Sequence, residues 1–153
     1  MRSELYEKTV TEREFIFTLI ASNENIGAEL VRWSKDGDKF TIYLKKYPET
    51  LFDEPEEVWN DYKNDAIALI NKLHLLQIYH GDISEQNYVV DPLKREIKLI
   101  DYGRSCWMTD IDEKGLGMYG LATSKADAVN MEFKEVDWLF RKKPAPRKRE
   151  EVM

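Results

Sequence analysis

The sequence predicts an α+β fold in which a small antiparallel sheet precedes a mostly helical region. Three observations carry this prediction. Residues 28–33 and 40–44 read as two strands on either side of an Asp-Gly turn, as in a β-hairpin. Residues 56–76 place apolar side chains at spacings of three and four, as in a long amphipathic helix. Two short apolar strands, 88–90 and 97–100, follow that helix and flank a second turn.

The first third of the chain supplies the boundaries of the hairpin. A helix should begin at Thr11, which can cap it, with Glu14 three residues later as in a capping box. The turn-forming residues 23–27 should end that helix. After the hairpin, Pro48 prevents the second strand from continuing.

The last third of the chain is less regular. Residues 104–131 show no clear period, whereas residues 132–140 are apolar at helical spacing and should form a last helix. Residues 115–120 match the pattern G-x-G-x-x-G. This run follows no clear strand and opens no βα unit, so we expect a flexible loop there instead of a phosphate-binding loop.

Composition indicates one ordinary globular domain, which we place at residues 1–140. The chain has 153 residues, of which 42% are hydrophobic and 34% charged. Residues 141–149 contain six basic residues and no acid, so residues 141–153 are expected to form a disordered basic tail. The net charge of −6 therefore hides a strongly acidic body. Such a body argues against nucleic acid as a partner, except through the tail. The simpler interpretation of the tail is a solvated end that aids solubility.

The sequence also predicts where the protein resides. No apolar run approaches the roughly 18 residues of a transmembrane helix, and residues 1–8 lack the apolar stretch of a secretory signal. The single cysteine, Cys106, cannot form an internal disulfide. We therefore expect no membrane span and an intracellular, cytoplasmic protein.

Two motifs point to chemistry on phosphate groups. Residues 80–87 have the form H-x-D-x-x-x-x-N, and residues 97–103 form an apolar strand that ends in Asp-x-Gly. The motifs bring Asp82, Asn87 and Asp101 onto two adjacent turns. Carboxylate and amide oxygens, completed by phosphates and waters, are ligands that Mg²⁺ prefers. Either motif alone could be a plain turn, but their joint occurrence after a long helix favours phosphoryl transfer.

These motifs resemble those of the protein-kinase-like superfamily, and the likeness covers roughly residues 10–140. The resemblance implies a protein-kinase-like fold with a truncated small lobe and a partial, mostly helical large lobe. It implies ATP and Mg²⁺ as ligands, with Asp82 and Asn87 as catalytic residues and Asn87 and Asp101 as metal ligands. His80 would fix its turn by hydrogen bonds. Gly81 and Ser84 make this loop most similar to those of the small atypical kinases of the RIO and Bud32 families.

The same resemblance implies a nucleotide-binding segment after the second hairpin strand. Its backbone would contact adenine, and it comprises Leu44, Lys45, Lys46 and Tyr47. Glu14 would pair with a phosphate-anchoring lysine, for which Lys8 is the nearest candidate, six positions earlier. The sequence contains no Gly-rich loop and no Val-Ala-x-Lys segment before Glu14.

Further structural roles follow from the resemblance. Asp137, on the last helix, would form a hydrogen bond back to the loop at residues 80–87. Gly103 would let the chain turn sharply after Asp101. The family's Ala-Pro-Glu sequence is absent between residues 117 and 125.

Two functions are therefore compared. The first is a minimal ATP-dependent phosphotransferase that acts on a hydroxyl group, by resemblance a serine or threonine of a protein substrate. Intact Asp82, Asn87 and Asp101 favour it. The alternative is a catalytically inactive pseudokinase that binds or inhibits a partner kinase or another protein, which the missing Gly-rich loop favours.

Overall fold

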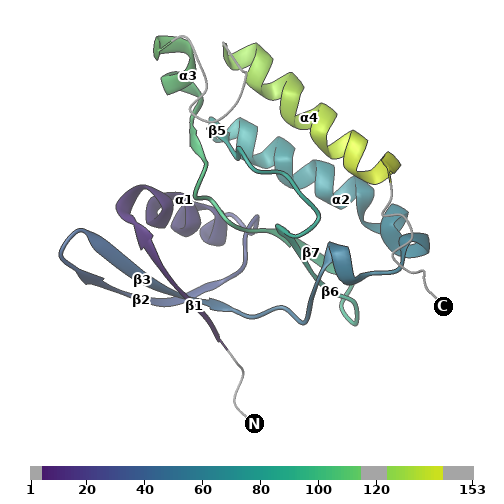
Figure 1. Ribbon diagram of the computed structural model, residues 1–153, viewed down its shortest axis with the longest axis horizontal. Helices are drawn as coiled ribbons and strands as arrows, with labels where there is room; N and C mark the ends of the chain where they lie inside the picture. The colour runs from purple at the N-terminus through teal and green to yellow at the C-terminus, as the bar shows by residue number, and fades with distance from the viewer. Residues whose placement is uncertain (1–4, 115–123, 143–153) are drawn as a thin grey trace.

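The computed structural model describes residues 5–114 and 124–142, apart from the side chains of residues 112–114 and 142. The glycine-containing run at 115–120 and the tail from residue 143 lie outside the described residues, so the predictions made for them stay predictions. The elements fall into two groups, a sheet with one helix and a larger, mainly helical part, shown in Figure 1.

The first group is a three-stranded antiparallel sheet in the order β1-β3-β2. Its strands are β1 (Leu5–Thr11), β2 (Leu30–Asp36) and β3 (Lys39–Lys45). The predicted hairpin is confirmed as β2 and β3, joined by a turn in which Gly37 has a φ of 66°. Strand β1 was not predicted. It pairs with β3 along its whole length and leads directly into helix α1 (Glu12–Asn23).

One face of this sheet is apolar, and α1 covers part of it. Lys8 is paired with Ile42 and Tyr6 with Leu44, so alternate residues of β1 and β3 share this inner face. Near its start, α1 packs Phe15 against Phe40, with ring centroids 4.3 Å apart. The other end of the inner face, around Leu44, is not covered by α1 and borders a cavity.

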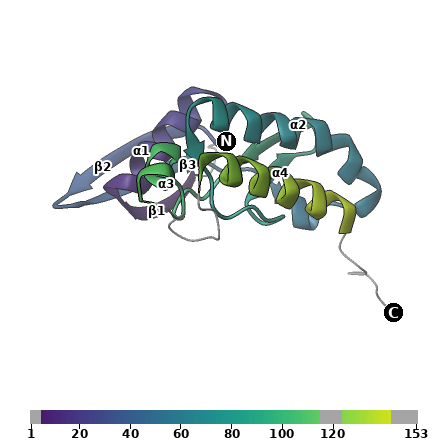
Figure 2. The same ribbon diagram turned by 90° about the horizontal axis from the view of Figure 1, so that it is seen from above.

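The second group is built on two helices, α2 (Glu56–Leu75) and α4 (Lys125–Lys142). They lie side by side in both views, Figures 1 and 2. The apolar stripe predicted on residues 56–76 is confirmed, because it forms the buried face of α2. Trp59 is fully buried in this core and donates from Nε1 to the carbonyl oxygen of Glu54 at 3.1 Å.

Short strands connect the helices to the sheet. One small sheet has the order β4-β6-β7, with β4 (Glu49–Thr50), β6 (Tyr88–Asp91) and β7 (Glu96–Leu99). Another pairs β5 (Ile78–Tyr79) with β8 (Cys106–Trp107), which leads into helix α3 (Met108–Lys114). A 3₁₀ turn at Leu51–Asp53 precedes α2. The strands predicted at 88–90 and 97–100 are thus β6 and β7.

The two groups are joined at the end of α1. The amide of Leu99 on β7 donates to the carbonyl oxygen of Ile26 at 2.9 Å. Lys98 donates from Nζ to the carbonyl oxygen of Asn25 at 3.0 Å, and Lys72 of α2 donates to that of Glu24 at 2.7 Å. Cations are favoured at this end of a helix, where carbonyl groups lack intrahelical partners. The end of α1 is thereby attached to the helical part.

Helix α4 begins at Lys125, seven residues before the predicted start. The side chain of Ser124 accepts a hydrogen bond from the amide of Asp127 at 3.2 Å, as a helix cap does. The helix was missed there because residues 125–131 carry few large apolar side chains. At its other end, α4 continues to Lys142.

Among the described residues, no helix combines the length and the apolar character needed to cross a membrane.

Candidate active site

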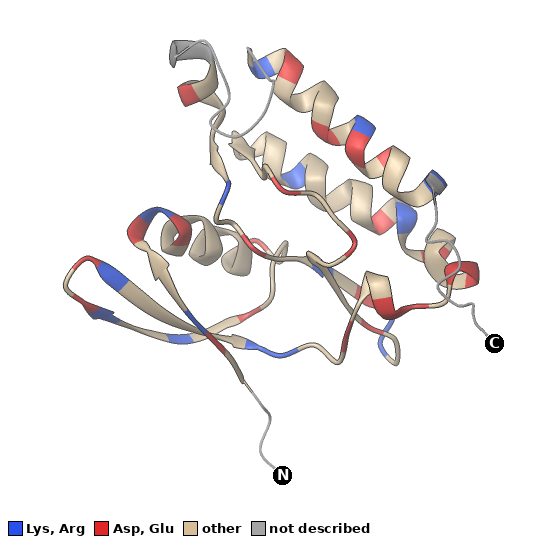
Figure 3. Ribbon diagram, viewed as in Figure 1, with Lys and Arg blue, Asp and Glu red and all other residues tan. Residues whose placement is uncertain are grey.

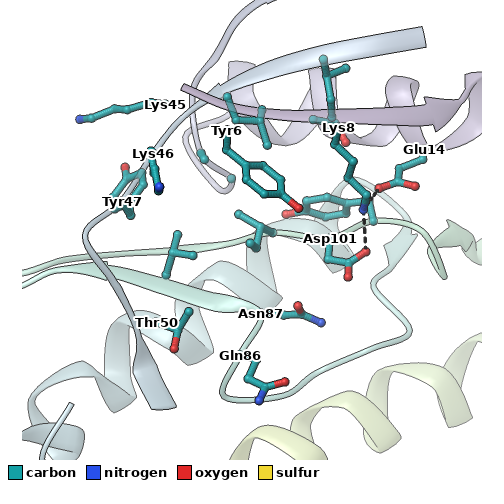
Figure 4. A pocket seen from close by; sticks show the side chains of 18 residues that line it. Tyr6, Lys8, Glu14, Lys45, Lys46, Tyr47, Thr50, Gln86, Asn87 and Asp101 are labelled. Carbon is teal, nitrogen blue, oxygen red and sulfur yellow. Dashed lines mark hydrogen bonds and ion pairs between the residues drawn. The ribbon is translucent and has the colours of Figure 1, made fainter. Parts of the chain in front are cut away.

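A cavity of about 310 Å³ lies between the inner face of the sheet, strand β6 and the segment that follows β7. This volume is at the lower end of the range typical of small-molecule sites. Figure 4 shows side chains from both groups pointing into the cavity. Its apolar walls include Ile42, Leu44, Val89 and Ile100. Its polar lining includes Lys8, Glu14, Asn87 and Asp101.

Lys8 joins two carboxylates at one end of the cavity. Its Nζ lies 2.7 Å from Oε2 of Glu14 and 3.4 Å from Oδ1 of Asp101. Burial alone would lower the pKa of Lys8, but the hydrogen bond and charge of Glu14, helped by Asp101, raise it above its usual value. Lys8 is therefore a stable cation held between the sheet, α1 and the segment after β7.

The six-residue interval between Lys8 and Glu14 is sufficient because no linker separates β1 from α1. Thr11 ends the strand, and its side chain accepts a hydrogen bond from the amide of Glu14 at 3.2 Å. The predicted cap therefore forms. The carboxylate of Glu14 contacts Lys8, so its position on the first turn of α1 is what brings it to the cavity.

Asp101 adopts the left-handed backbone conformation, with a φ of 68°. Its Oδ1 accepts hydrogen bonds from Lys8 and from the amide of Gly103, the latter at 3.3 Å. The chain turns at Gly103 as predicted, and the amide of Ser105 donates to the carbonyl oxygen of Tyr102 across that turn at 3.2 Å. The positive φ, however, belongs to Asp101 and not to Gly103. Gly103 provides room, because a Cβ there would lie 3.2 Å from Oε1 of Glu14.

The loop at residues 80–87 is held by its own histidine. His80 is fully buried, and its Nε2 lies 2.9 Å from the carbonyl oxygen of Ile100. Its Nδ1 accepts a hydrogen bond from the amide of Asp82 at 3.1 Å. Because Nδ1 accepts, Nε2 carries the hydrogen. The geometry agrees with the structural role predicted for His80.

Asn87 closes the same loop. Its Nδ2 donates to the carbonyl oxygen of Asp82 at 2.8 Å, and its own carbonyl oxygen accepts from the amide of Ile100 at 2.8 Å. The side-chain oxygen of Asn87 remains directed to the cavity, in which Asp101 also lies. Asp82 is half-buried on the loop and does not line the cavity itself.

Gly81 has no space for a side chain. Its φ is 88°, and a Cβ there would collide with the carbonyl oxygen of Arg104. Its amide donates to Oε2 of Glu132 at 2.7 Å. The residue between His80 and Asp82 is therefore a glycine because the segment after Asp101 passes directly over it.

The buried carboxylate that holds this loop belongs to Glu132. Its Oε1 accepts from the amide of His80 at 3.0 Å, and its Oε2 from the amide of Gly81. The prediction that Asp137 has this role is wrong. Asp137 lies at the surface, 2.7 Å from Arg141 and 3.6 Å from Lys63. Figure 3 shows acidic and basic residues along α4, so acidity alone did not identify the inward-facing residue.

The segment predicted to contact adenine lines the opposite end of the cavity, as Figure 4 shows. It consists of Leu44, Lys45, Lys46 and Tyr47. The amide of Lys45 donates to the carbonyl oxygen of Glu29 at 2.9 Å, so this donor is already used. Burial, together with the nearby Glu96, raises the pKa of Tyr47 to about 12. Tyr47 is thus a neutral hydrogen-bond donor, and its hydroxyl lies 3.4 Å from Oε1 of Glu96.

Within the described part of the chain, no three His, Cys, Asp or Glu side chains are grouped so that they could hold a metal ion by themselves. Asn87 and Asp101 supply one amide and one carboxylate. Both hydrogen bonds to Asp101 use Oδ1, and no described residue donates to Oδ2. Such a pair suits Mg²⁺, which commonly takes one or two protein oxygens and completes its shell with phosphates and waters.

No protein-family model matches this sequence, and no curated protein matches it. Solved structures do match the fold. One is the structure of the Cydia pomonella granulovirus kinase PK-1, with a TM-score of 0.62 and 20% sequence identity. The match covers 89% of this chain and 60% of that kinase chain. The protein therefore has a protein-kinase-like α+β fold and spans about 60% of the length of that kinase chain.

Proposed function

We propose that this protein binds ATP with Mg²⁺ in the cavity and transfers the γ-phosphoryl group to a hydroxyl, that of a serine or threonine in a protein substrate. The observation that carries the proposal is the meeting of Lys8, Glu14 and Asp101 at one end of a cavity that Asn87 also lines. These residues come from four separate segments. Their convergence gives a cation and oxygen ligands at one place, which binding of a triphosphate–metal complex requires.

The cavity divides into an apolar part and a charged part. Adenine would lie between Leu44 and Val89 and take hydrogen bonds from the backbone beyond Lys45, whose own amide is occupied. Lys8 would neutralise phosphate charge, and Glu14 would hold Lys8 in place. Asn87 and Asp101 would hold Mg²⁺, which supplies charge neutralisation on the phosphate oxygens when bound.

Asp82 is the residue proposed to act on the acceptor. Its amide is fixed by His80 and its carbonyl oxygen by Asn87, which lines the cavity, while the residue as a whole is only partly buried. The acceptor oxygen forms a bond to the γ-phosphorus as the bond from that phosphorus to the β-phosphate oxygen breaks. Asp82 orients the acceptor hydroxyl and takes its proton.

Gly81 and Ser84 support a kinship with the small atypical kinases of the RIO and Bud32 families. In this interpretation the absence of an arginine before Asp82 means that the loop needs no phosphorylated partner segment.

Nucleotide binding tests the proposal. Thermal unfolding is followed with ATP alone and with ATP plus Mg²⁺, for wild type and for Asp101→Ala. At about 100 times its Kd, a ligand adds ~2.7 kcal/mol of stability, which for a chain of this size raises Tm by about 5–10 °C. The rise should require Mg²⁺ and vanish in Asp101→Ala. The matched control is Asp36→Ala, which removes an exposed acid on the hairpin and should keep the rise.

Transfer is then measured with ³²P-labelled ATP and casein as a generic acceptor. Asp82→Ala should lose transfer and keep the ATP-dependent rise in Tm, because Asp82 does not line the cavity. Equal transfer by wild type and Asp82→Ala would contradict the proposed role. No rise in Tm at millimolar ATP would reject the proposal and favour an inactive pseudokinase that binds a partner protein.

A further inference from the structure

A buried hydrogen-bond cluster connects α2, α4 and the start of the loop at residues 80–87. Its centre is the fully buried carboxylate of Glu132. Besides the two backbone amides described above, this carboxylate contacts Nε2 of His74 on α2, 2.9 Å from Oε1. Three donors therefore surround one carboxylate. His74 is the only donor among the three that comes from a side chain.

The hydrogen bonds fix the form of the His74 ring. A carboxylate oxygen only accepts, so Nε2 of His74 carries the hydrogen. Its Nδ1 is buried and has no hydrogen-bond partner among the described residues. A second N–H at Nδ1 would be a buried donor without an acceptor, which is costlier than an unused lone pair. The ring edge packs against Phe133, with centroids 5.2 Å apart and planes at 88°, so rotation of the ring is also restricted.

The cluster continues to Asp82, the residue proposed to take the proton of the acceptor hydroxyl. Glu132 accepts from the amides of His80 and Gly81, and the ring of His80 accepts from the amide of Asp82. Three successive amides are thus bound, two by the carboxylate of Glu132 and the third by the ring of His80. A change in the orientation of the Glu132 carboxylate would release two of these amides directly and the third through His80.

We propose that His74 is a positioning residue. It fixes the Glu132 carboxylate and, through that carboxylate, the backbone that carries Asp82. Its effect on turnover rests on the phosphotransfer function proposed above. Neither His74 nor Glu132 lines the nucleotide cavity. Loss of the His74 hydrogen bond should therefore lower kcat and leave the KM for ATP unchanged. A role limited to stabilising the fold would not separate these two quantities.

Two variants of His74 separate the hydrogen bond from packing. In His74→Gln the amide Nε2 occupies nearly the place of the ring Nε2 and can still donate. In His74→Leu the volume is retained and the donor is lost. Loss of a hydrogen bond to a buried charged group changes a rate constant by about tenfold or more, if the bond is needed in the transition state. We expect His74→Leu to lower kcat about tenfold with an unchanged KM for ATP, and His74→Gln to stay within about threefold of wild type.

A second readout does not depend on turnover. Hydrogen exchange of the His80 and Gly81 amides is followed by NMR in the full chain. Both amides should be protected in wild type and in His74→Gln, and both should exchange faster in His74→Leu. If His74→Leu does not fold, His74→Asn replaces it, because its amide is too short to reach Glu132. Leu75→Ala, at an exposed neighbouring position, should leave both readouts unchanged.

The outcomes separate this inference from the proposed function. Wild type that transfers no phosphate would reject the phosphotransfer proposal. If protection of the His80 and Gly81 amides from exchange still depends on the donor at position 74, the structural role of His74 is kept. Unchanged protection in His74→Leu overturns the inference, whether or not the wild type is active. Equal losses in His74→Gln and His74→Leu overturn it too, because packing would then account for both.

Discussion

Replacing Gly81 by alanine tests whether the loop that carries Asp82 depends on the close passage of the chain over it. At Gly81 the φ is 88°, and an added Cβ would collide with the carbonyl oxygen of Arg104. Gly37 is a matched control within the same protein. Its φ is 66°, and an added Cβ would meet nothing within 4 Å.

Both substitutions place a side chain in the left-handed backbone region, but only Gly81→Ala also creates a steric overlap. A residue with a Cβ loses about 1–2 kcal/mol in the left-handed region, and Gly37→Ala should show this cost alone. Gly81→Ala adds a steric overlap of about 1–3 kcal/mol. If the loop moves to relieve that overlap, it weakens the bond to the buried Glu132, which adds about 1.5–3 kcal/mol. We therefore expect Gly81→Ala to lose about 2–5 kcal/mol if the loop keeps its place, and about 3.5–8 kcal/mol if the bond to Glu132 is weakened as well.

The assay is urea unfolding of both variants and of wild type, because the midpoint and slope give the free energy of unfolding. Gly81→Ala should unfold at a clearly lower urea concentration than Gly37→Ala. Where it remains folded, it should also transfer phosphate more slowly, since the amide of residue 81 would be displaced from Glu132. Equal free energies of unfolding for the two variants would refute the steric argument.

Three further predictions concern charged groups. Desolvation, with the charges of Glu132 and Asp82 nearby, raises the pKa of Glu135 from 4.5 to about 7, so stability is lost as the pH rises between these two values. Glu135→Gln should therefore have a higher Tm than wild type at pH 8, and the two should agree near pH 4. Lys98→Ala should lose about 1 kcal/mol in urea unfolding, because Lys98 caps the end of α1. Glu14→Gln should weaken ATP binding in a titration, whereas Glu12→Gln on the same helix turn should not.

Local sequence signals were sufficient for much of the fold. The Asp-Gly turn between β2 and β3 and the apolar stripe of α2 predicted elements that depend mainly on their own residues. Strand β1 was missed because its burial is uneven: most of its side chains are exposed, and only Val10 is fully buried. Such a strand exists because β3 pairs with it, and pairing between distant segments is not visible in a local pattern.

The candidate site was predicted unevenly for a similar reason. Asp82, Asn87 and Asp101 follow fixed intervals along the chain, and the structure brings Asn87 and Asp101 to one cavity. The family resemblance pointed to Asp137 for the supporting carboxylate, whereas the structure uses Glu132 on the same helix. The residues differ in burial: Glu132 is enclosed by other elements, and Asp137 faces solvent. Which face of a helix meets another element depends on tertiary packing.

The direct passage of β1 into α1 limits how the length of this segment can change. Side chains of a strand alternate between the two faces of the sheet, so Lys8 lies on the inner face only while its register to the helix is kept. Insertion or deletion of one residue between Lys8 and Thr11 would turn the lysine to the outer face and separate it from Glu14. A change of two residues would restore the face but displace the lysine by about 7 Å. This segment should therefore be intolerant of length variation, although it lies at the edge of the sheet, where insertions are otherwise accommodated.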